Sequence, residues 1–191
     1  MEEQAATLLA TLKKPSTAVD TKIALFNNLK SNIKHLRVPE ASQAPIFECI
    51  RLAISASTSA SLVSTGFSTL GHLVKRLVLQ NQTTILTSQT NRLLPILLDR
   101  LGDARDSHRN AASQILADLW PFAHNEVEAL IKDNAMKGTN ARAKEVSMQW
   151  LVKVINNSSQ FMLIVGYEID TSTDEQERRI AIPQLCSIGC R

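Results

Sequence analysis

Apolar residues recur every three or four positions through the first 155 residues, which is the pattern of amphipathic helices. One such stripe consists of Ile23, Phe26, Leu29, Ile33 and Leu36. Proline-containing, serine-rich or polar segments separate each stripe from the next, and these residues favour turns and helix caps. The pattern therefore predicts eight helices, over residues 2–13, 17–37, 40–56, 60–79, 85–101, 107–119, 121–136 and 141–155.

The eight predicted helices fall into four pairs. The breaks inside the pairs lie near residues 15, 58, 104 and 138, which are 43, 46 and 34 residues apart. Two helices in a unit of about 40–47 residues is typical of HEAT and armadillo repeats. A single pair cannot bury its apolar face alone, so neighbouring pairs stack. We therefore predict an all-α solenoid of about four helix pairs over residues 1–155.

Residues 93–112, LLPILLDRLGDARDSHRNAA, carry the spacing of a HEAT repeat. Asp103 follows Pro95 by eight residues and precedes Arg109 by six. A proline in the first helix, an aspartate in the turn and an arginine in the second helix match the HEAT consensus. We interpret the three as a structural ladder, in which the carboxylate accepts from backbone N–H groups and from arginines of its own or the adjacent repeat. His108 stands where the consensus prefers valine, and we expect it to cover apolar surface.

The same stretch resembles the third repeat of the first TOG domain of CLASP proteins, which are microtubule rescue factors. Residues 61–78, SLVSTGFSTLGHLVKRLV, and 135–151, AMKGTNARAKEVSMQWL, resemble the second and fourth repeats. Few aromatic residues and many Ser and Thr suggest a fungal member. The resemblance implies a non-catalytic module that associates with tubulin or microtubules and supports spindle stability. It implies a location in the cytoplasm, on the cytoskeleton and spindle, with the nucleus as a further site.

The resemblance also implies binding through the turns inside the pairs. The corresponding residues are Lys13, Lys14, Arg105, Lys137, Asn140, Arg142 and Lys144. TOG domains that grip tubulin strongly tend to place a tryptophan in the first turn, and here that turn, KKPSTAVDTK, has no aromatic residue. An alternative therefore stays open: an adaptor that docks a kinetochore or spindle component without touching tubulin.

Net charge and composition limit the classes of partner that we expect for this chain. The chain has a net charge of +3, and residues 1–155 alone carry 18 basic and 13 acidic groups. A mildly basic body suits an acidic protein partner but is too weak a signal for nucleic acid. Dispersed histidines predict no metal site, and no phosphate loop or nucleophile motif points to a cofactor, a small-molecule substrate or an enzyme. No apolar run is long enough to predict a membrane span.

The last segment, residues 156–191, departs from the repeat pattern. Residues 161–169, FMLIVGYEI, read as a strand, and no HEAT spacing is visible. A TOG domain has six HEAT repeats, so the resemblance implies a domain truncated after its fourth repeat. We expect 1–155 to form an incomplete TOG-like domain and 156–191 to form an atypical, poorly ordered tail.

Overall fold

The computed structural model describes residues 1–56, 59–137 and 139–164. The chain divides into two units, Met1–Val154 and Ile155–Arg191, and the packing described below is that of the first. Every regular element in the described part of the chain is helical, and the described ranges contain no strand. The elements are α1 (Glu2–Lys13), α2 (Val19–His35), α3 (Glu40–Ser55), α4 (Ala60–Leu79), α5 (Thr84–Leu101), α6 (Asp106–Leu119), the 3₁₀ turn η1 (Trp120–Phe122), α7 (His124–Lys137) and α8 (Ala141–Ile164).

Most helices begin and end within two residues of their predicted limits, and the exceptions are the start of α7 and the end of α8. We predicted that Pro121 opens α7, whereas Pro121 lies in η1 and α7 begins at His124. Pro121 has no backbone N–H, and the N–H of Ala123 bonds back to the carbonyls of Leu119 and Trp120. Ala123 then takes φ −150 and ψ 45, which is not helical, so the 3₁₀ turn and α7 are separate elements.

The predicted strand at 161–169 is wrong for its first four residues, which belong to α8. The prediction rested on β-favouring side chains, whose preference depends strongly on context. No glycine or proline interrupts residues 141–164, so nothing in the backbone stops the helix at 155. The rest of that predicted strand, and most of the predicted tail, lies outside the described residues.

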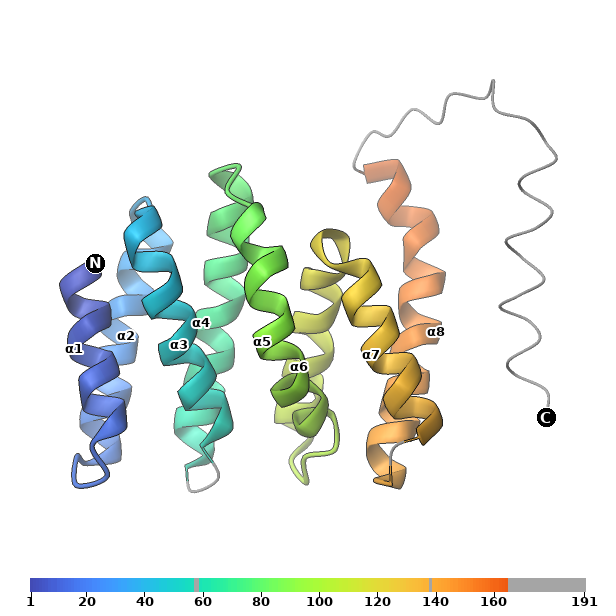
Figure 1. Ribbon diagram of the computed structural model, residues 1–191, viewed down its shortest axis with the longest axis horizontal. Coiled ribbons are helices and arrows are strands. Elements are labelled where there is room, and N and C mark those ends of the chain that lie inside the picture. The colour runs from blue at the N-terminus through green and yellow to red at the C-terminus, as the bar shows by residue number, and fades with distance from the viewer. Residues whose placement is uncertain (57–58, 138, 165–191) are drawn as a thin grey trace, which may run out of the picture. The chain divides into compact units, whose positions relative to one another are not determined.

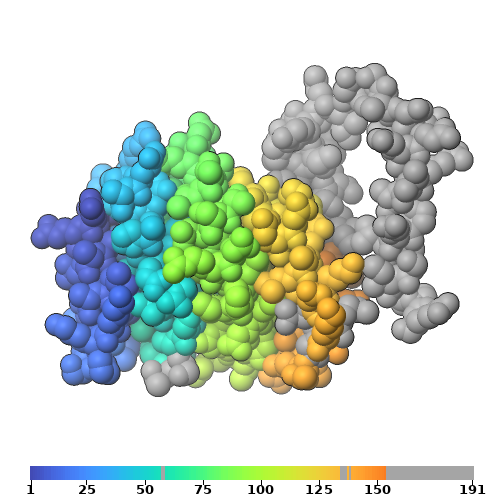
Figure 2. Space-filling model, viewed as in Figure 1, coloured from blue at the N-terminus to red at the C-terminus, as the bar shows by residue number. Residues whose placement is uncertain are grey.

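The helices of the first unit form two layers. Helices α1, α3, α5 and α7 lie side by side in chain order, and α2, α4 and α6 lie side by side behind them (Figure 1). The predicted apolar stripes largely face each other between the layers, and Phe26, Ile33, Phe67 and Leu70 are buried there. Leu36, predicted to continue the α2 stripe, lies beyond the end of the helix and is 54% exposed. In space-filling view the front layer is an unbroken series of neighbouring bands (Figure 2). The predicted all-α solenoid of HEAT-type pairs is confirmed.

Stacking of antiparallel pairs sorts the connections onto two edges. The connections inside the pairs lie together at the lower edge of Figure 1, and the connections between pairs lie at the upper edge. We call the lower edge, made of the described residues 14–18, 56, 59, 102–105, 139 and 140, the turn edge. This arrangement brings together turns that are about 35 to 45 residues apart in the sequence.

Candidate partner-binding edge

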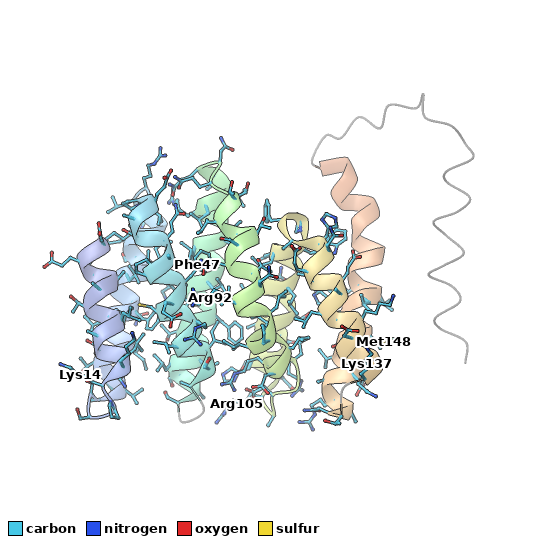
Figure 3. The ribbon with its side chains drawn as sticks, in the orientation of Figure 1. Lys14, Phe47, Arg92, Arg105, Lys137 and Met148 are labelled. Atoms are coloured by element: carbon cyan, nitrogen blue, oxygen red, sulfur yellow. The ribbon has the colours of Figure 1, made fainter. Side chains whose placement is uncertain are left out.

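Three of the predicted binding residues mark the length of the turn edge. Lys14, Arg105 and Lys137 lie along it, from the first pair to the fourth (Figure 3). All three side chains are exposed. Residues from separate repeats therefore present positive charge on one side of the molecule, as the stacked-pair prediction required.

Asp103 organises the third turn. Its side chain is only 8% exposed. Oδ1 accepts from the backbone N–H of Arg105 at 2.9 Å, and Oδ2 accepts from Arg100 Nη1 at 2.8 Å and faces His108 Nδ1 at 3.1 Å. Burial by itself raises the pKa of this carboxyl, but the hydrogen bonds from Arg105, His108 and Arg100 together hold the pKa well below its ordinary value. Asp103 is therefore a carboxylate at neutral pH that fixes the turn.

Arg109 contacts the third turn through backbone carbonyls, and not through the Asp103 carboxylate as the predicted ladder required. Its Nη1 donates to the backbone carbonyls of Asp103 and Ala104, at 2.7 and 3.0 Å, and its guanidinium pairs with Asp106. The arginine on the Asp103 carboxylate is Arg100 instead. Arg109 lies in the first turn of α6, where it reaches the carbonyls of residues 103 and 104, and the carboxylate already has other donors.

Arg100 links neighbouring repeats, and the sequence analysis missed it. Its Nε donates to the carbonyl of Ile54 at 2.9 Å and its Nη2 to that of Ala56 at 3.0 Å. These carbonyls lie at the C-terminal end of α3, so a single guanidinium satisfies the inner turn of one repeat while it holds Asp103 in the next. The available signal was a basic residue in the last turn of α5. Pro95 lies inside α5, exposed, and its role as a ladder residue stays a prediction.

His108 has more than the apolar covering role that we predicted. It is 2% exposed, with Nδ1 toward Asp103 and Nε2 3.3 Å from Ser64 Oγ on α4. An ionised carboxylate can only accept, so Nδ1 carries the proton and Nε2 can accept from the serine hydroxyl. The ring also lies 6.4 Å from the ring of Phe67, between centroids. His108 thus ties α6 to the preceding repeat by polar bonds as well as by packing.

Asn140 connects the third and fourth turns. Its Oδ1 caps α8 by accepting from the N–H of Ala143 at 3.1 Å. Its Nδ2 lies where a Cβ on Gly102 would approach to 2.7 Å, so a side chain at 102 would displace it. Asn140 therefore has a structural task on the turn edge, and binding of a partner by this residue stays a prediction.

The remaining predicted cations lie in α1, α7 and the first turn of α8. Lys13 ends α1, and its charge contributes to the lowered pKa of Glu48 on α3, where the hydrogen bond from Arg51 is the main cause. Lys137 pairs with Asp133 one turn earlier, at 3.1 Å and with both groups exposed. Such a pair holds the lysine only weakly, by about 0.2–0.5 kcal/mol.

Arg142 borders a hollow of about 390 Å³ between α6 and α8, which Arg109 and Lys153 also line. Lys144, half-buried, is on the same first turn of α8, and that turn has no acidic residue. Positive side chains are unfavourable near a helix N-terminus, where the helix dipole is itself positive. The fourth pair thus concentrates positive potential beside the turn edge.

Other chemistry predicted from the sequence is sparse in the described residues. No cluster of three or more potential metal ligands occurs among them, and no described helix combines the length and apolar character that a membrane span requires. Cys49 is buried, while Cys186 and Cys190 lie outside the described residues. Burial raises the pKa of the Cys49 thiol to about 12. The first turn, residues 14–18, has no aromatic side chain.

The described helices form a TOG-like HEAT-repeat module. Its features are stacked helix pairs, inner turns aligned on one edge and an aspartate-centred turn linked to the preceding repeat. The family model described as CLASP N terminal matches residues 1–168, and the chain belongs to this family. Protein STU1 of Phaeosphaeria nodorum is 66% identical over 154 residues, which are 81% of this chain and 13% of that protein. Protein STU1 of Coccidioides immitis is 47% identical, again over 81% of this chain and 12% of its own length. The chain therefore spans only a small part of these relatives.

A solved structure supports the fold independently. The crystal structure of the MAST/Orbit N-terminal domain matches with a TM-score of 0.61 at 20% sequence identity, over 78% of this chain and 65% of that one. At this identity the likeness concerns the fold alone. The predicted CLASP membership and TOG-like architecture are both confirmed.

Proposed function

We propose that the chain is a TOG-type binding module of a CLASP-like protein that associates with tubulin or microtubules through its turn edge. It would act on the cytoskeleton and spindle, where it would help to stabilise spindle microtubules. The observation that carries the proposal is the alignment of the inner turns, with Lys14, Arg105 and Lys137 along one edge (Figure 3). Membership of the CLASP N-terminal family supports the choice of partner.

Charge is the physical basis of the proposed contact. Lys13, Lys14, Arg105, Lys137, Arg142 and Lys144 supply six cations on or beside the turn edge. Each exposed ion pair contributes only about 0.2–1 kcal/mol, so several would have to act together. A one-signed edge would also speed the encounter with an acidic surface, and both effects would weaken as salt screens charges beyond about 8 Å.

The first turn favours a second candidate function. Interfaces usually depend on a few buried aromatic or arginine anchors, and residues 14–18 offer no aromatic one. A weak edge of this kind suits an adaptor that docks a kinetochore or spindle protein without touching tubulin. Both candidates are binding functions and use no cofactor.

A charge-reversal experiment separates the two functions. The full chain is tested for co-sedimentation with microtubules and for binding of free tubulin, at low and at physiological salt. We expect Arg105→Glu with Lys144→Glu to abolish salt-sensitive binding. The matched control, Lys34→Glu with Lys75→Glu, changes the net charge equally on α2 and α4, away from the turn edge, and should leave binding intact.

Each other result has a defined meaning. Absence of binding at low salt by the unaltered chain would favour the adaptor. Equal loss in both double variants would indicate a general charge effect and contradict a contact through the turn edge. Loss in the control alone would place the contact on the α2–α4 layer.

A further inference from the structure

The C-terminal halves of α2 and α4 form a surface whose charged side chains are all basic. On α2 and just beyond it these are Lys30, Lys34, His35 and Arg37, and on α4 they are His72, Lys75 and Arg76. Residues 21–39 and 49–98 contain no Asp or Glu. No charge on either helix segment therefore offsets these cations.

The two basic stripes are adjacent in space. Arg76 Nε on α4 donates to the carbonyl of Ile33 on α2 at 2.9 Å, and its Nη2 bonds to the carbonyl of Lys34. Beyond the helix ends, Gln80 Oε1 accepts from the N–H of Val38 at 2.9 Å. The two stripes therefore meet at the C-terminal ends of α2 and α4. These ends face away from the turn edge, in the layer behind α1 and α3 (Figure 1).

The lysines surround a central histidine. Lys30 and Lys34 are one helical turn apart, as are His72 and Lys75, so each pair shares a helix face. Partial burial lowers the pKa of His72, and the charges of Lys34, Lys30 and Lys75 lower it further. The charges of three lysines thus converge near His72 from two helices, and the side chains of Lys34 and Lys75 are exposed.

Two exposed leucines border the basic stripes. Leu36 follows α2 and is 54% exposed, and Leu79 ends α4 and is 76% exposed. Both leucines are within two residues of the hydrogen bond between Val38 and Gln80, so they lie near the adjacent C-terminal ends of α2 and α4. A single exposed leucine is common on protein surfaces. Two exposed leucines beside a basic patch can supply the apolar part of a contact whose charged part comes from the lysines. Glu40, which begins α3 two residues after Val38, accepts a hydrogen bond from Gln82 Nε2 at 3.0 Å.

We infer that this α2–α4 surface binds an acidic peptide segment of a partner protein that carries aliphatic residues. The cations would pair with its carboxylates, and Leu36 and Leu79 would contact its apolar side chains. Lys30 and Arg37 are seven residues apart, so the patch is about 10 Å long, and it can contact about three successive residues of a longer extended peptide. Single-stranded nucleic acid would require aromatic side chains for base stacking, and residues 27–38 and 71–80 contain no Phe, Trp or Tyr.

Fluorescence anisotropy of the full chain with a dye-labelled peptide tests this inference. The probe is an acidic peptide of about eight residues, mostly glutamate with two leucines, and the control peptide has glutamine in place of glutamate. We expect Lys34→Glu with Lys75→Glu to weaken binding of the acidic probe by about tenfold or more. Leu36→Ser with Leu79→Ser should weaken it several-fold with its salt dependence retained. Circular dichroism checks that each variant is folded.

A variant of equal charge change elsewhere supplies the matched control. Lys132→Glu with Lys153→Glu alters two exposed lysines on α7 and α8 and should change the probe's Kd by less than about twofold. Equal loss in both charge variants, equal binding of the glutamine peptide, or tighter binding of a single-stranded RNA to the same surface would overturn the inference. The assay contains no tubulin, so its outcome is independent of the function proposed for the turn edge.

Discussion

Replacement of Asp103 by alanine should destabilise the domain far more than its place in a turn suggests. The change removes the acceptor of Arg100, of His108 and of the Arg105 N–H at once. Hydrogen bonds to charged groups contribute about 1.5–3 kcal/mol each, but Arg100 would keep the carbonyls of Ile54 and Ala56. We therefore expect a loss of about 2–4 kcal/mol, from a typical total of about 5–15 kcal/mol.

Urea denaturation of the full chain at pH 7 measures this loss. With an m-value of about 2 kcal/mol/M, the midpoint should fall by about 1–2 M. Asp106→Ala is the matched control, because Asp106 pairs with Arg109 in the same turn but its side chain is 80% exposed. An exposed pair of this kind contributes at most about 1 kcal/mol. Equal midpoints for the two variants would refute the role assigned to Asp103.

The pH dependence supplies a second, independent readout. The pKa of Asp103 in the folded state lies well below the unfolded value of about 3.9, so the unfolded chain takes up this proton first as pH falls. The contribution of Asp103 is thus complete above about pH 5 and declines below about pH 4. The stability gap between the unaltered chain and Asp103→Asn should narrow between pH 5 and pH 3. A gap that stays constant would contradict a carboxylate in this role.

Three further experiments test helix packing, the burial of a cysteine and a buried hydrogen bond. Gly66→Ala would place a Cβ 3.0 Å from the Cβ of Ala53 and should lower the Tm. Gly71→Ala is the matched control, because its Cβ would meet only an ordinary 3.7 Å contact, and helix propensity should raise the free energy of unfolding by about 0.5–1 kcal/mol. In a variant with serine at positions 186 and 190, Cys49 is the only cysteine. Because burial raises the pKa of its thiol to about 12, Cys49 should resist alkylation at pH 8 until urea unfolds the chain. Alkylation of the folded protein would contradict its burial. Trp150→Phe removes the 2.9 Å hydrogen bond from the indole N–H to the carbonyl of Ser113. The free energy of unfolding measured with urea should fall by about 1 kcal/mol. An unchanged urea midpoint would show that this hydrogen bond does not stabilise the fold.

The helices and their pairing were readable from the sequence because both depend on local order. An apolar stripe repeats every three or four residues, and a cap or breaker lies close to the helix that it limits. The limits of α1 and α4 agree with the prediction to the residue. Spacing also singled out Asp103 and Arg109, and it assigned the predicted cations to turns that the stacked pairs then brought to one edge.

The partners of those residues were decided only by the tertiary structure. Arg100 bonds to carbonyls 46 and 44 residues earlier, and His108 meets a serine 44 residues earlier, so neither contact leaves a periodic trace in the chain. The basic surface of α2 and α4 likewise exists only because two helices about 40 residues apart lie side by side. Helix periodicity is a property of neighbours along the chain, whereas these contacts depend on the angle and offset at which whole pairs stack, which side-chain packing across the layers sets.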